Sequence, residues 1–547
     1  MDSQFKEGFK LEMPETRTCQ PDRQLRQRKK KKGSKPVFKE YAQNQMTLLP
    51  PSLEELIEER HMVRIVSETI DKLNMQPLIE TYKGGGTSSY NPEMLLKVWV
   101  YGILEKIYTG RKLAKALREN IHFMWISGGN RPDFRTINQF RSGRLKVVIE
   151  EIFLETVVFL AEGNYIDMKK YFIDGTKMLA DANKTSYVWK RNTERYKQSV
   201  RERIRKMFKE IDEINKKEDE QYGNKDLEEK GEDSRMRSED IKEHVEKLNM
   251  IIKGSSIEEQ KKKKAERIIK KIEQKELSKI EKYEAQEEVL GQRNSYSKTD
   301  NDATFFRMKD KRLLPAYTVL AGTENQYILN YSLHQSASES DKLKEHIDRY
   351  KKYFKKYPEL VSGDSAFGSE ENSEYLEGKG IKNYLKYNTF HYESTKAYKE
   401  NKFHKDHFKY DEKTDTYQCP HGRRMQLEEE VEVETSTGYK QKIRKYKTED
   451  CSGCPYRGQC KKGKGRRTIQ INRKLDYYRS KMRENLTSEK GIELRKQRNV
   501  DVEPVFGDIK WNHGYARFKL RGKEKVNVEV GLLSIAHNLK KLSLTIN

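Results

Sequence analysis

The sequence predicts a protein of several folded units built around a mixed α/β core. Its 547 residues are too many for one ordinary hydrophobic core. Two short apolar runs, 171–174 and 360–364, each end in an acidic residue, as core strands often do. Helical periodicity dominates before and between these runs. We therefore expect an α/β core, an all-helical domain before it, a long coiled-coil-like helical insertion, and a small β-rich insertion that contains cysteines.

The chain begins with a polar, basic segment, which we assign to residues 1–47. It contains Arg23, Arg26, Arg28 and a run of lysines over 29–32. Such a run is typical of a solvated tail, and it can also hold phosphates without sequence preference.

Residues 48–165 have the pattern of a compact all-helical domain. Ser52 and Glu55 have the spacing of a capping box, so we expect a helix to begin directly after Ser52. A glycine loop at 84–86 follows, and Pro92 lies in the first turn of the next expected helix. Further helical patterns cover 111–126 and 134–162.

Residues 191–298 are rich in Lys, Glu and Arg and contain no proline. Two narrow apolar stripes run through the segment. Their members are Ile204, Phe208 and Ile211 in the first, and Ile269, Ile272 and Ile280 in the second. This pattern predicts long helices, arranged as a coiled-coil hairpin with an acidic, polar link near 216–238. A solvated helical insertion without chemistry is the plainer interpretation.

The α/β core should comprise residues 166–190 and 299–400. Strand patterns cover 313–320 and 326–333, and Gly322 to Asn325 would form the hairpin turn between them. A helix near 338–356 and a strand at 381–387 follow. Short strands should surround the cysteines in the β-rich insertion, 401–472, and the remaining residues, 473–547, should be mostly helical.

Asp174 and Asp364 are the first candidate catalytic residues. Each stands at the C-terminal end of an apolar run and precedes small or polar residues. Acids at the ends of such strands would meet at one edge of a sheet. Carboxylates are the ligands that Mg²⁺ prefers, and divalent ions promote phosphodiester cleavage. Taken singly, such an Asp is more often a turn residue.

The third candidate is Glu503, an acid between Val502 and Pro504. Metal would neutralise the acid, while Arg498 and Lys510 could bind DNA phosphate. The alternative is the start of an ordinary amphipathic helix. Because proline disfavours helical geometry at the preceding residue, we expect that helix to begin at Glu503.

The charge of the chain indicates a polyanionic partner. Lys and Arg number 111 against 86 Asp and Glu, which gives a formal net charge of +25. DNA or RNA is the commonest partner of so basic a protein, although a basic protein that binds neither is the alternative. Runs of about 18 apolar residues and secretion signals are lacking, so we expect a protein of the reducing bacterial cytoplasm that contacts no membrane.

A cluster of cysteines lies in the β-rich segment. Cys451, Cys454 and Cys460 lie close together, and Cys419 precedes Cys451 by 32 residues. Four thiolates suit a tetrahedral structural Zn²⁺, and His421 is a substitute ligand. The alternative is four reduced thiols. Basic residues beside the cluster would favour DNA contact, namely Lys461, Lys462, Lys464, Arg466 and Arg467.

Several motifs in order resemble those of the bacterial insertion-sequence DDE transposases. The motifs are FIDGTK at 172–177, AN at 182–183, VWK at 188–190, DATFFRMK at 302–309, GDSAFGS at 363–369, and VEPVFG at 502–507 with Lys510. The segments 49–53, 61–64, 90–97 and 111–113 resemble the family's InsH-type N-terminal domain. The resemblance runs from about residue 48 to the C-terminus, interrupted chiefly by the helical insertion.

This resemblance implies an RNase H-like catalytic core in which Asp174, Asp364 and Glu503 bind Mg²⁺ or Mn²⁺. Lys510 follows Glu503 after six intervening residues, as in the Tyr-Arg-Glu-Lys signature of related transposases. The implied activity is cleavage and strand transfer of double-stranded DNA, with terminal inverted repeats and target DNA as partners. It also implies a homodimer on DNA, associated with the nucleoid.

Three other functions remain open from the sequence. An RNase H-like nuclease would cut DNA without strand transfer. A catalytically inactive DNA-binding relative would keep the fold and bind DNA without cutting it. A coiled-coil scaffold protein would explain only 190–298 and would leave Asp174 and Asp364 unexplained.

Overall fold

The computed structural model describes residues 52–82, 89–222, 236–254, 259–463 and 465–546. Residues Leu53–Asn547 form one compact unit, distinct from Met1–Ser52. The predicted basic tail at 1–47 and the glycine loop at 84–86 therefore lie outside the described residues. Among the helices described, none has the length and apolar character needed to cross a membrane.

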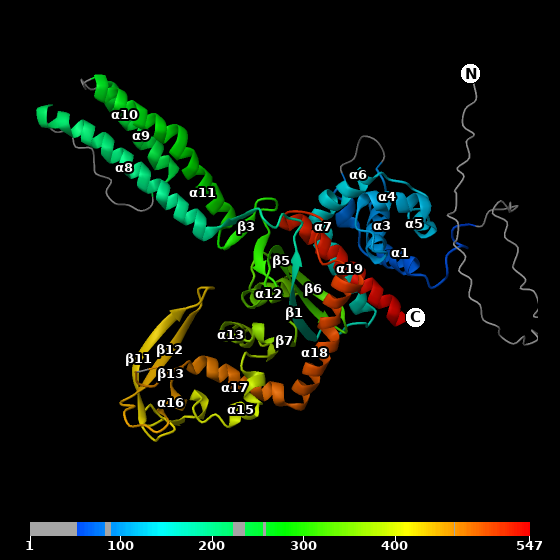
Figure 1. Ribbon diagram of the computed structural model, residues 1–547. Helices are drawn as coiled ribbons and strands as arrows, with labels where there is room; N and C mark the ends of the chain where they lie inside the picture. Colours follow the sequence, from blue (N-terminus) through cyan, green and yellow to red (C-terminus); the bar gives the residue numbers. More distant parts are fainter. Residues whose placement is uncertain (1–51, 83–88, 223–235, 255–258, 464, 547) are drawn as a thin grey trace, which may run out of the picture. The chain divides into compact units, whose positions relative to one another are not determined.

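Residues 62–162 are mainly helical, and their helices are visible in Figure 1. They are α1 (Met62–Lys72), α2 (Gln76–Ile79), α3 (Pro92–Leu104), α4 (Gly110–Glu119), α5 (Ile121–Ile126), α6 (Phe134–Gln139), the π-helical turn η1 (Phe140–Arg144) and α7 (Leu145–Glu162). Their apolar faces share one continuous core with the sheet and with the C-terminal helices.

The helix expected directly after Ser52 is not formed, because residues 53–60 are turns and α1 begins only at Met62. The side chain of Arg64 stabilises these turns. Its guanidinium pairs with the Glu54 carboxylate and donates to the carbonyl oxygens of Glu54 at 2.9 Å and Ile57 at 3.0 Å. The imidazole of His61 then caps α1 by accepting from Val63 N at 3.2 Å. The prediction of a helix directly after Ser52 was therefore wrong.

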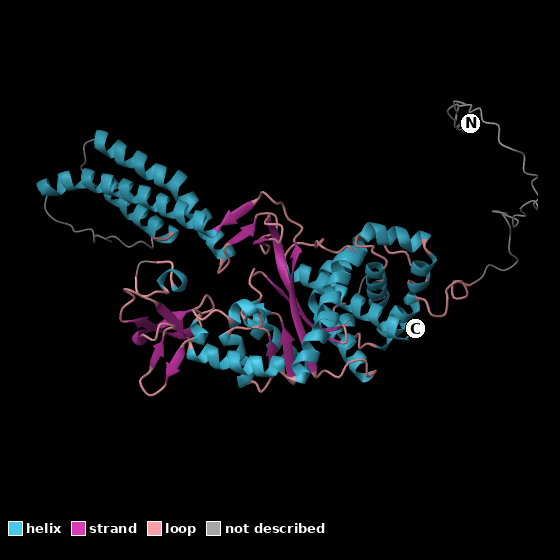
Figure 2. Ribbon diagram, turned by 60° about the horizontal axis from the view of Figure 1, so that its bottom comes forward, coloured by secondary structure: helices cyan, strands magenta, loops and turns pink. Residues whose placement is uncertain are grey.

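A central sheet of six strands carries the core, and Figure 2 shows it flanked by helices. The strands are β1 (Lys170–Leu179), β4 (Thr304–Arg307), β5 (Leu313–Glu324), β6 (Tyr327–His334), β7 (Leu360–Gly363) and β8 (Lys382–Leu385). Their order is β4-β5-β1-β7-β8, and β6 also pairs with β5. β5 pairs antiparallel with β1 and β6, while β1, β7 and β8 are mutually parallel.

Two details of the sheet differ from the prediction. β1 continues past Asp174, because β5 pairs with it from Phe172↔Thr323 to Leu179↔Ala316. Asp174 is thus mid-strand instead of at a strand end. The hairpin turn also lies later than predicted. β5 runs to Glu324, and Asn325 and Gln326 form a two-residue loop with φ of 56° and 68°. Positive φ at both positions suits the right-handed twist of a hairpin.

Helices between the strands cover the sheet. They are η3 (Ser340–Lys342), α12 (Leu343–Phe354), η4 (Ser365–Phe367) and α13 (Glu370–Gly378), followed by the short α14 (Phe390–Glu393), α15 (Lys396–Lys399) and η5 (Lys405–His407). The C-terminal part is helical, as predicted: α17 (Arg473–Thr487), α18 (Glu489–Gly507), the π-helical turn η6 (Asp508–Asn512) and α19 (Lys523–Ile546).

Glu503 lies inside α18, so the prediction of a helix beginning at Glu503 was wrong. Pro504 has no N–H to donate to the carbonyl of Val500. The side-chain amide of Gln326, from the β5–β6 turn, donates to that oxygen instead, at 2.8 Å. The carboxylate of Asp501 accepts from Thr323 Oγ1 at 2.6 Å and from Gln326 N at 3.1 Å. Contacts distant in sequence therefore allow a proline within this helix.

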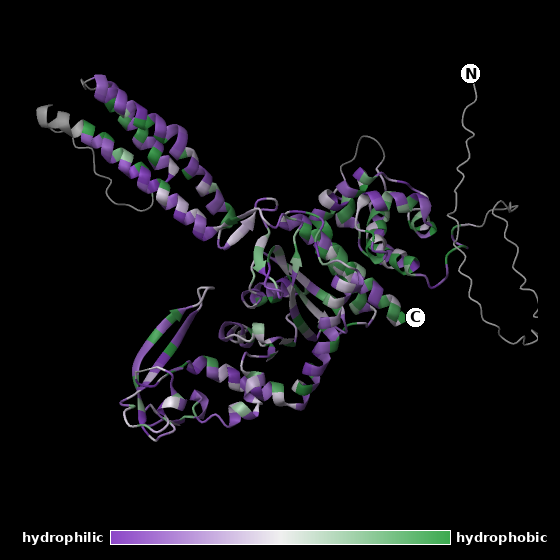
Figure 3. Ribbon diagram, in the orientation of Figure 1, coloured by the Kyte–Doolittle hydropathy of each residue, from purple (hydrophilic) through white to green (hydrophobic). Residues whose placement is uncertain are grey.

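The insertion forms long helices with a core of its own. They are α8 (Lys190–Tyr222), α9 (Ser238–Gly254), α10 (Glu259–Lys271), the π-helical turn η2 (Ile272–Leu277) and α11 (Ser278–Leu290). Every residue of the two predicted stripes is buried in that core, which the hydropathy colouring of Figure 3 shows as green within polar helices. The expected polar link lies largely outside the described residues. The base of the insertion is a two-stranded pair, β2 (Tyr187–Trp189) with β3 (Ser295–Ser297).

The cysteine-containing segment forms a separate five-stranded antiparallel sheet in the order β13-β12-β11-β10-β9. The strands are β9 (Lys409–Asp411), β10 (Thr416–Gln418), β11 (Arg424–Glu434), β12 (Lys440–Thr448) and β13 (Thr468–Ile471), with the short helix α16 (Arg457–Cys460) beside them. A small apolar cluster around Met425 and Tyr446 is its core.

Because the insertion has its own core, its removal should leave the catalytic unit folded. Lys197 Nζ and Glu287 Oε2 lie 2.6 Å apart, so a short Gly-Ser linker between these two residues can replace 198–286. We expect the shortened protein to unfold in one cooperative thermal transition, followed by circular dichroism. A broad, non-cooperative transition would show that the central sheet depends on the insertion.

Candidate active site

The sheet brings Asp174 and Asp364 to neighbouring positions. β1 and β7 are parallel, and their register pairs Ile173 with Gly363. Each acid directly follows a member of that pair, so the two lie where the parallel pairing ends. The Asp364 carboxylate accepts from Ser365 N at 2.6 Å and starts η4. Burial raises the pKa of Asp174, the guanidinium of Arg498 opposes this, and the charges of Asp364 and Glu503 raise the pKa further.

Glu503 reaches the same region from α18, which packs against β1, β5 and β7. Arg498, one and a half turns earlier on this helix, connects the acids. Its Nη1 lies 3.0 Å from Glu503 Oε1, and its Nη2 lies 3.3 Å from Asp174 Oδ1. The Arg498 side chain is 5% exposed, whereas those of Asp174 and Glu503 are 22% and 53% exposed. A buried cation therefore joins two of the candidate acids.

Lys510 ties the turn after α18 to β1. Its Nζ donates to Thr176 Oγ1 and, at 2.7 Å, to the carbonyl oxygen of Lys177. Burial lowers the pKa of Lys510 to about 8. Arg498 and Lys510 thus bind groups of the protein in this structure, and their contact with DNA phosphate stays a prediction.

Two residues that the sequence analysis did not single out border the site. The carboxylate of Glu339 lies against Gly175, the residue after Asp174. Burial and the positive charge of Arg498 lower the pKa of Lys386, and the charges of Asp364 and Glu503 oppose this. Neither residue belongs to a motif, since each approaches the acids only through the fold. In the sequence, the glycine after Asp174 was the one sign that another group could approach this acid closely.

Within the described ranges, no group of three or more His, Cys, Asp or Glu side chains is arranged to hold a metal ion. The charges of Asp174 and Glu503 are instead compensated by Arg498. The donor set itself consists of carboxylate oxygens, which are the ligands that Mg²⁺ and Mn²⁺ prefer.

The four cysteines of the second sheet lie together. Cys419, Cys451, Cys454 and Cys460 all line a cavity of about 30 Å³. Burial raises the pKa of Cys460, and the other three thiols act in the same direction. Burial would also raise the pKa of Cys451, but hydrogen bonds from Thr448 Oγ1 and Arg467 N lower it overall.

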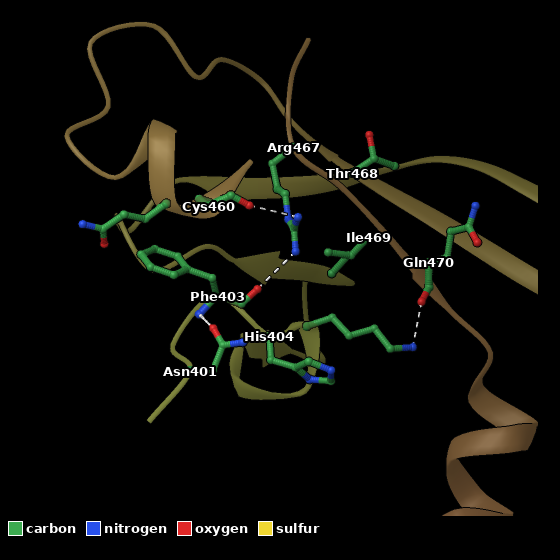
Figure 4. Close-up of a pocket in the computed structure, with 10 residues that line it drawn as sticks. Asn401, Phe403, His404, Cys460, Arg467, Thr468, Ile469 and Gln470 are labelled. Carbon is green, nitrogen blue, oxygen red and sulfur yellow. Dashed lines mark hydrogen bonds between the residues drawn. The ribbon is translucent and has the colours of Figure 1, made fainter. Parts of the chain in front are cut away.

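Basic residues near the cysteines donate hydrogen bonds to backbone carbonyls of this segment. A hollow of about 580 Å³ lies next to Cys460. There Arg467 donates to the carbonyl oxygens of Cys460 and Phe403, both at 3.1 Å (Figure 4). Lys405 Nζ donates to Gln470 O at 2.9 Å. No candidate catalytic acid lines this hollow. Lys464 lies outside the described residues.

Comparison with known families decides the identity. The family described as a transposase DDE domain matches residues 418–543, which include the cysteines, Arg498, Glu503 and Lys510. The family described as a transposase domain, DUF772, matches residues 51–143. The chain is an insertion-sequence DDE transposase. This transposase matches no curated protein. The DDE match does not extend to β1 or β7. The assignment of Asp174 and Asp364 as catalytic acids is therefore based on the resemblance and on the sheet register.

Replacing Arg498 by Met should destabilise the transposase when metal and DNA are absent. The change removes the cation that compensates Asp174 and Glu503, and we expect a loss of about 2 kcal/mol. The measurement is urea unfolding in the presence of EDTA. Lys496→Met, at an exposed position of the same helix, is the matched control. Equal stability of the two variants would contradict a compensating role for Arg498.

Proposed function

We propose that Asp174, Asp364 and Glu503 are the catalytic, metal-binding acids of this transposase and that its central sheet is an RNase H-like core. Two observations support the proposal: the β1–β7 register puts Asp174 and Asp364 at neighbouring positions, and Arg498 bridges Asp174 and Glu503. The sheet supports the fold assignment: three antiparallel strands, β6-β5-β1, continue into the parallel strands β7 and β8.

The site suits Mg²⁺ or Mn²⁺, which Asp174, Asp364 and Glu503 would hold through their carboxylate oxygens. Divalent ions bound there would activate the attacking oxygen and stabilise the leaving oxygen during phosphodiester cleavage. Arg498 keeps two of the acids charge-compensated before binding. Lys510, through Thr176 and Lys177, fixes the turn after α18 to β1 and so positions Glu503 relative to Asp174.

The reaction would proceed in two stages on double-stranded DNA. Water first cleaves the phosphodiester at a transposon end, and the freed 3′-hydroxyl then attacks target DNA. The helical segment 48–165 would hold the terminal inverted repeats, and the net charge of +25 favours binding to phosphates. Two ends must be joined together, so we propose a homodimer on DNA, acting on the nucleoid of a bacterial cell. A nuclease with this core would release cut ends without joining them to target DNA.

We also propose that Cys419, Cys451, Cys454 and Cys460 bind a structural Zn²⁺. All four line one small cavity, and four thiolates are a common zinc ligand set. His421 is the less favoured ligand, because its ring packs edge-on against Tyr456 with centroids 6.1 Å apart. Because the apolar core of this sheet is small, such a cross-link would stabilise it.

The zinc proposal predicts one zinc ion per chain in protein purified without chelator, measured by atomic emission. Cys454→Ser should lower the zinc content to a small fraction of one, because a tetrahedral site loses a ligand. Ser452→Ala, an exposed neighbour in the same loop, is the control. Zinc-free parent protein that remains zinc-free after refolding with Zn²⁺ would contradict the proposal and favour four reduced thiols.

Glu503→Gln should abolish cleavage of transposon-end DNA while leaving DNA binding nearly unchanged. Gln keeps the shape of the side chain but lacks the charge that holds a divalent ion, and loss of such a group costs about 10³-fold or more in rate. The assay uses labelled end DNA with Mg²⁺, and gel shift measures binding. Glu493→Gln, exposed on the same helix, is the control and should cut like the parent. Normal cleavage by Glu503→Gln would remove Glu503 from the catalytic acids.

A further inference from the structure

The carboxylate of Glu339 fills the space that a side chain at Gly175, the residue after Asp174, would occupy. Glu339 lies in the loop between β6 and η3, and its carboxylate rests on Gly175. A Cβ atom at position 175 would come within 2.5 Å of both Cδ and Oε2 of Glu339. The loop is also fixed to β5, because Thr318 Oγ1 donates to Ser336 O at 2.7 Å. The missing side chain at Gly175 therefore leaves room for a carboxylate next to the first candidate acid.

Asn372 fixes the same loop to the turn that carries Asp364. This side chain is 2% exposed, and its Nδ2 donates to Ser340 O at 2.8 Å and to Phe367 O at 2.9 Å. Ser340 directly follows Glu339, and Phe367 ends the short helix η4 that Asp364 caps. One buried amide thus sets the spacing between the backbone of Glu339 and that of Asp364.

The carboxylate of Glu339 is partly buried, and in the part of the chain that the structure describes it has no hydrogen-bond or ion-pair partner. Burial raises its pKa, and the charges of Asp174 and Asp364 act in the same direction, while Lys177 and Lys510 oppose them. An acid held among acids destabilises the metal-free fold through like-charge repulsion. A bound cation would relieve that repulsion.

We propose that Glu339 is a fourth carboxylate of the divalent-cation site of this transposase, acting together with Asp174 and Asp364. This inference rests on the proposed function of Asp174, Asp364 and Glu503. The ligand class is a hard divalent cation, Mg²⁺ or Mn²⁺, that Glu339 binds through its oxygens or through a cation-bound water. The site would then include a residue outside the three-acid motif.

The experiment measures Mn²⁺ binding to the full-length protein without DNA, by the electron paramagnetic resonance signal of free Mn²⁺. Glu339→Gln should weaken binding by about 10-fold or more, as loss of a group that supports a metal does. Glu345→Gln is the matched control, since Glu345 lies on α12 six residues later and its side chain is 62% exposed. The control should bind Mn²⁺ like the parent.

Thermal unfolding in EDTA separates this role from a structural one. Without metal, Glu339→Gln should unfold at a higher temperature than the parent, because the change removes a repelled charge. Addition of Mg²⁺ should stabilise the parent more than the variant. Gly175→Ala is a second variant, which displaces the Glu339 carboxylate and should also weaken Mn²⁺ binding.

The outcomes distinguish this inference from the proposed function. Parent-like Mn²⁺ binding by Glu339→Gln, together with weakened binding by Asp174→Asn, would overturn the role of Glu339 and leave the three acids in place. Parent-like binding by Asp174→Asn as well would overturn the metal assignment as a whole. A lower unfolding temperature of Glu339→Gln in EDTA, with unchanged Mn²⁺ affinity, would assign Glu339 to folding alone.

Discussion

The pairing of β1 on both of its edges is the constraint on which the rest of the structure depends. On one edge β5 runs antiparallel along eight residues of β1, and on the other β7 runs parallel only as far as Ile173↔Gly363. Where β7 stops, the chain turns away at Asp364, while β1 continues beside β5. Asp174 is therefore held in a rigid strand next to an open edge. Carboxylates can gather there without disrupting a sheet.

Hydrogen bonds from the β5–β6 hairpin position α18 against the sheet. Its two-residue loop places Gln326 where the side-chain amide satisfies the carbonyl of Val500, and Thr323 with Gln326 N binds Asp501. A proline inside a helix usually kinks or ends it. Here the hairpin replaces the lost hydrogen bond, and α18 carries Glu503 and Arg498 to β1. The helix with the third acid thus depends on a turn that lies far from it in sequence.

The negative charge of the acids at this site is compensated by a buried arginine. A protein with a net charge of +25 holds several acids in one region, and Arg498 is buried among them. Buried ion pairs contribute little net stability, but the loss of one partner is costly. Arg498 would therefore stabilise the proposed metal site before a cation binds.

The sequence predicted features that depend on local patterns. Strand-like runs before Asp174 and Asp364, the helical stripes around Ile204 and Ile269, and the mixed helical and sheet architecture were all visible in it. The predictions that failed depended on distant partners. The turns after Ser52 follow from Arg64, the full length of β1 follows from β5, and the helix through Pro504 follows from Gln326. Glu339 has no motif at all, because only the folded chain brings it to Gly175.

In the proposed function, Asp174, Asp364 and Glu503 surround one divalent-cation site. Iron-directed cleavage of the polypeptide tests it most directly: Fe²⁺ replaces Mg²⁺ in the full-length protein, and ascorbate with peroxide then generates radicals that cut the backbone near the bound iron. We expect fragments that end close to residues 174, 364 and 503, all suppressed by excess Mg²⁺. Cuts confined to other segments, or absent near any one of these three residues, would contradict it.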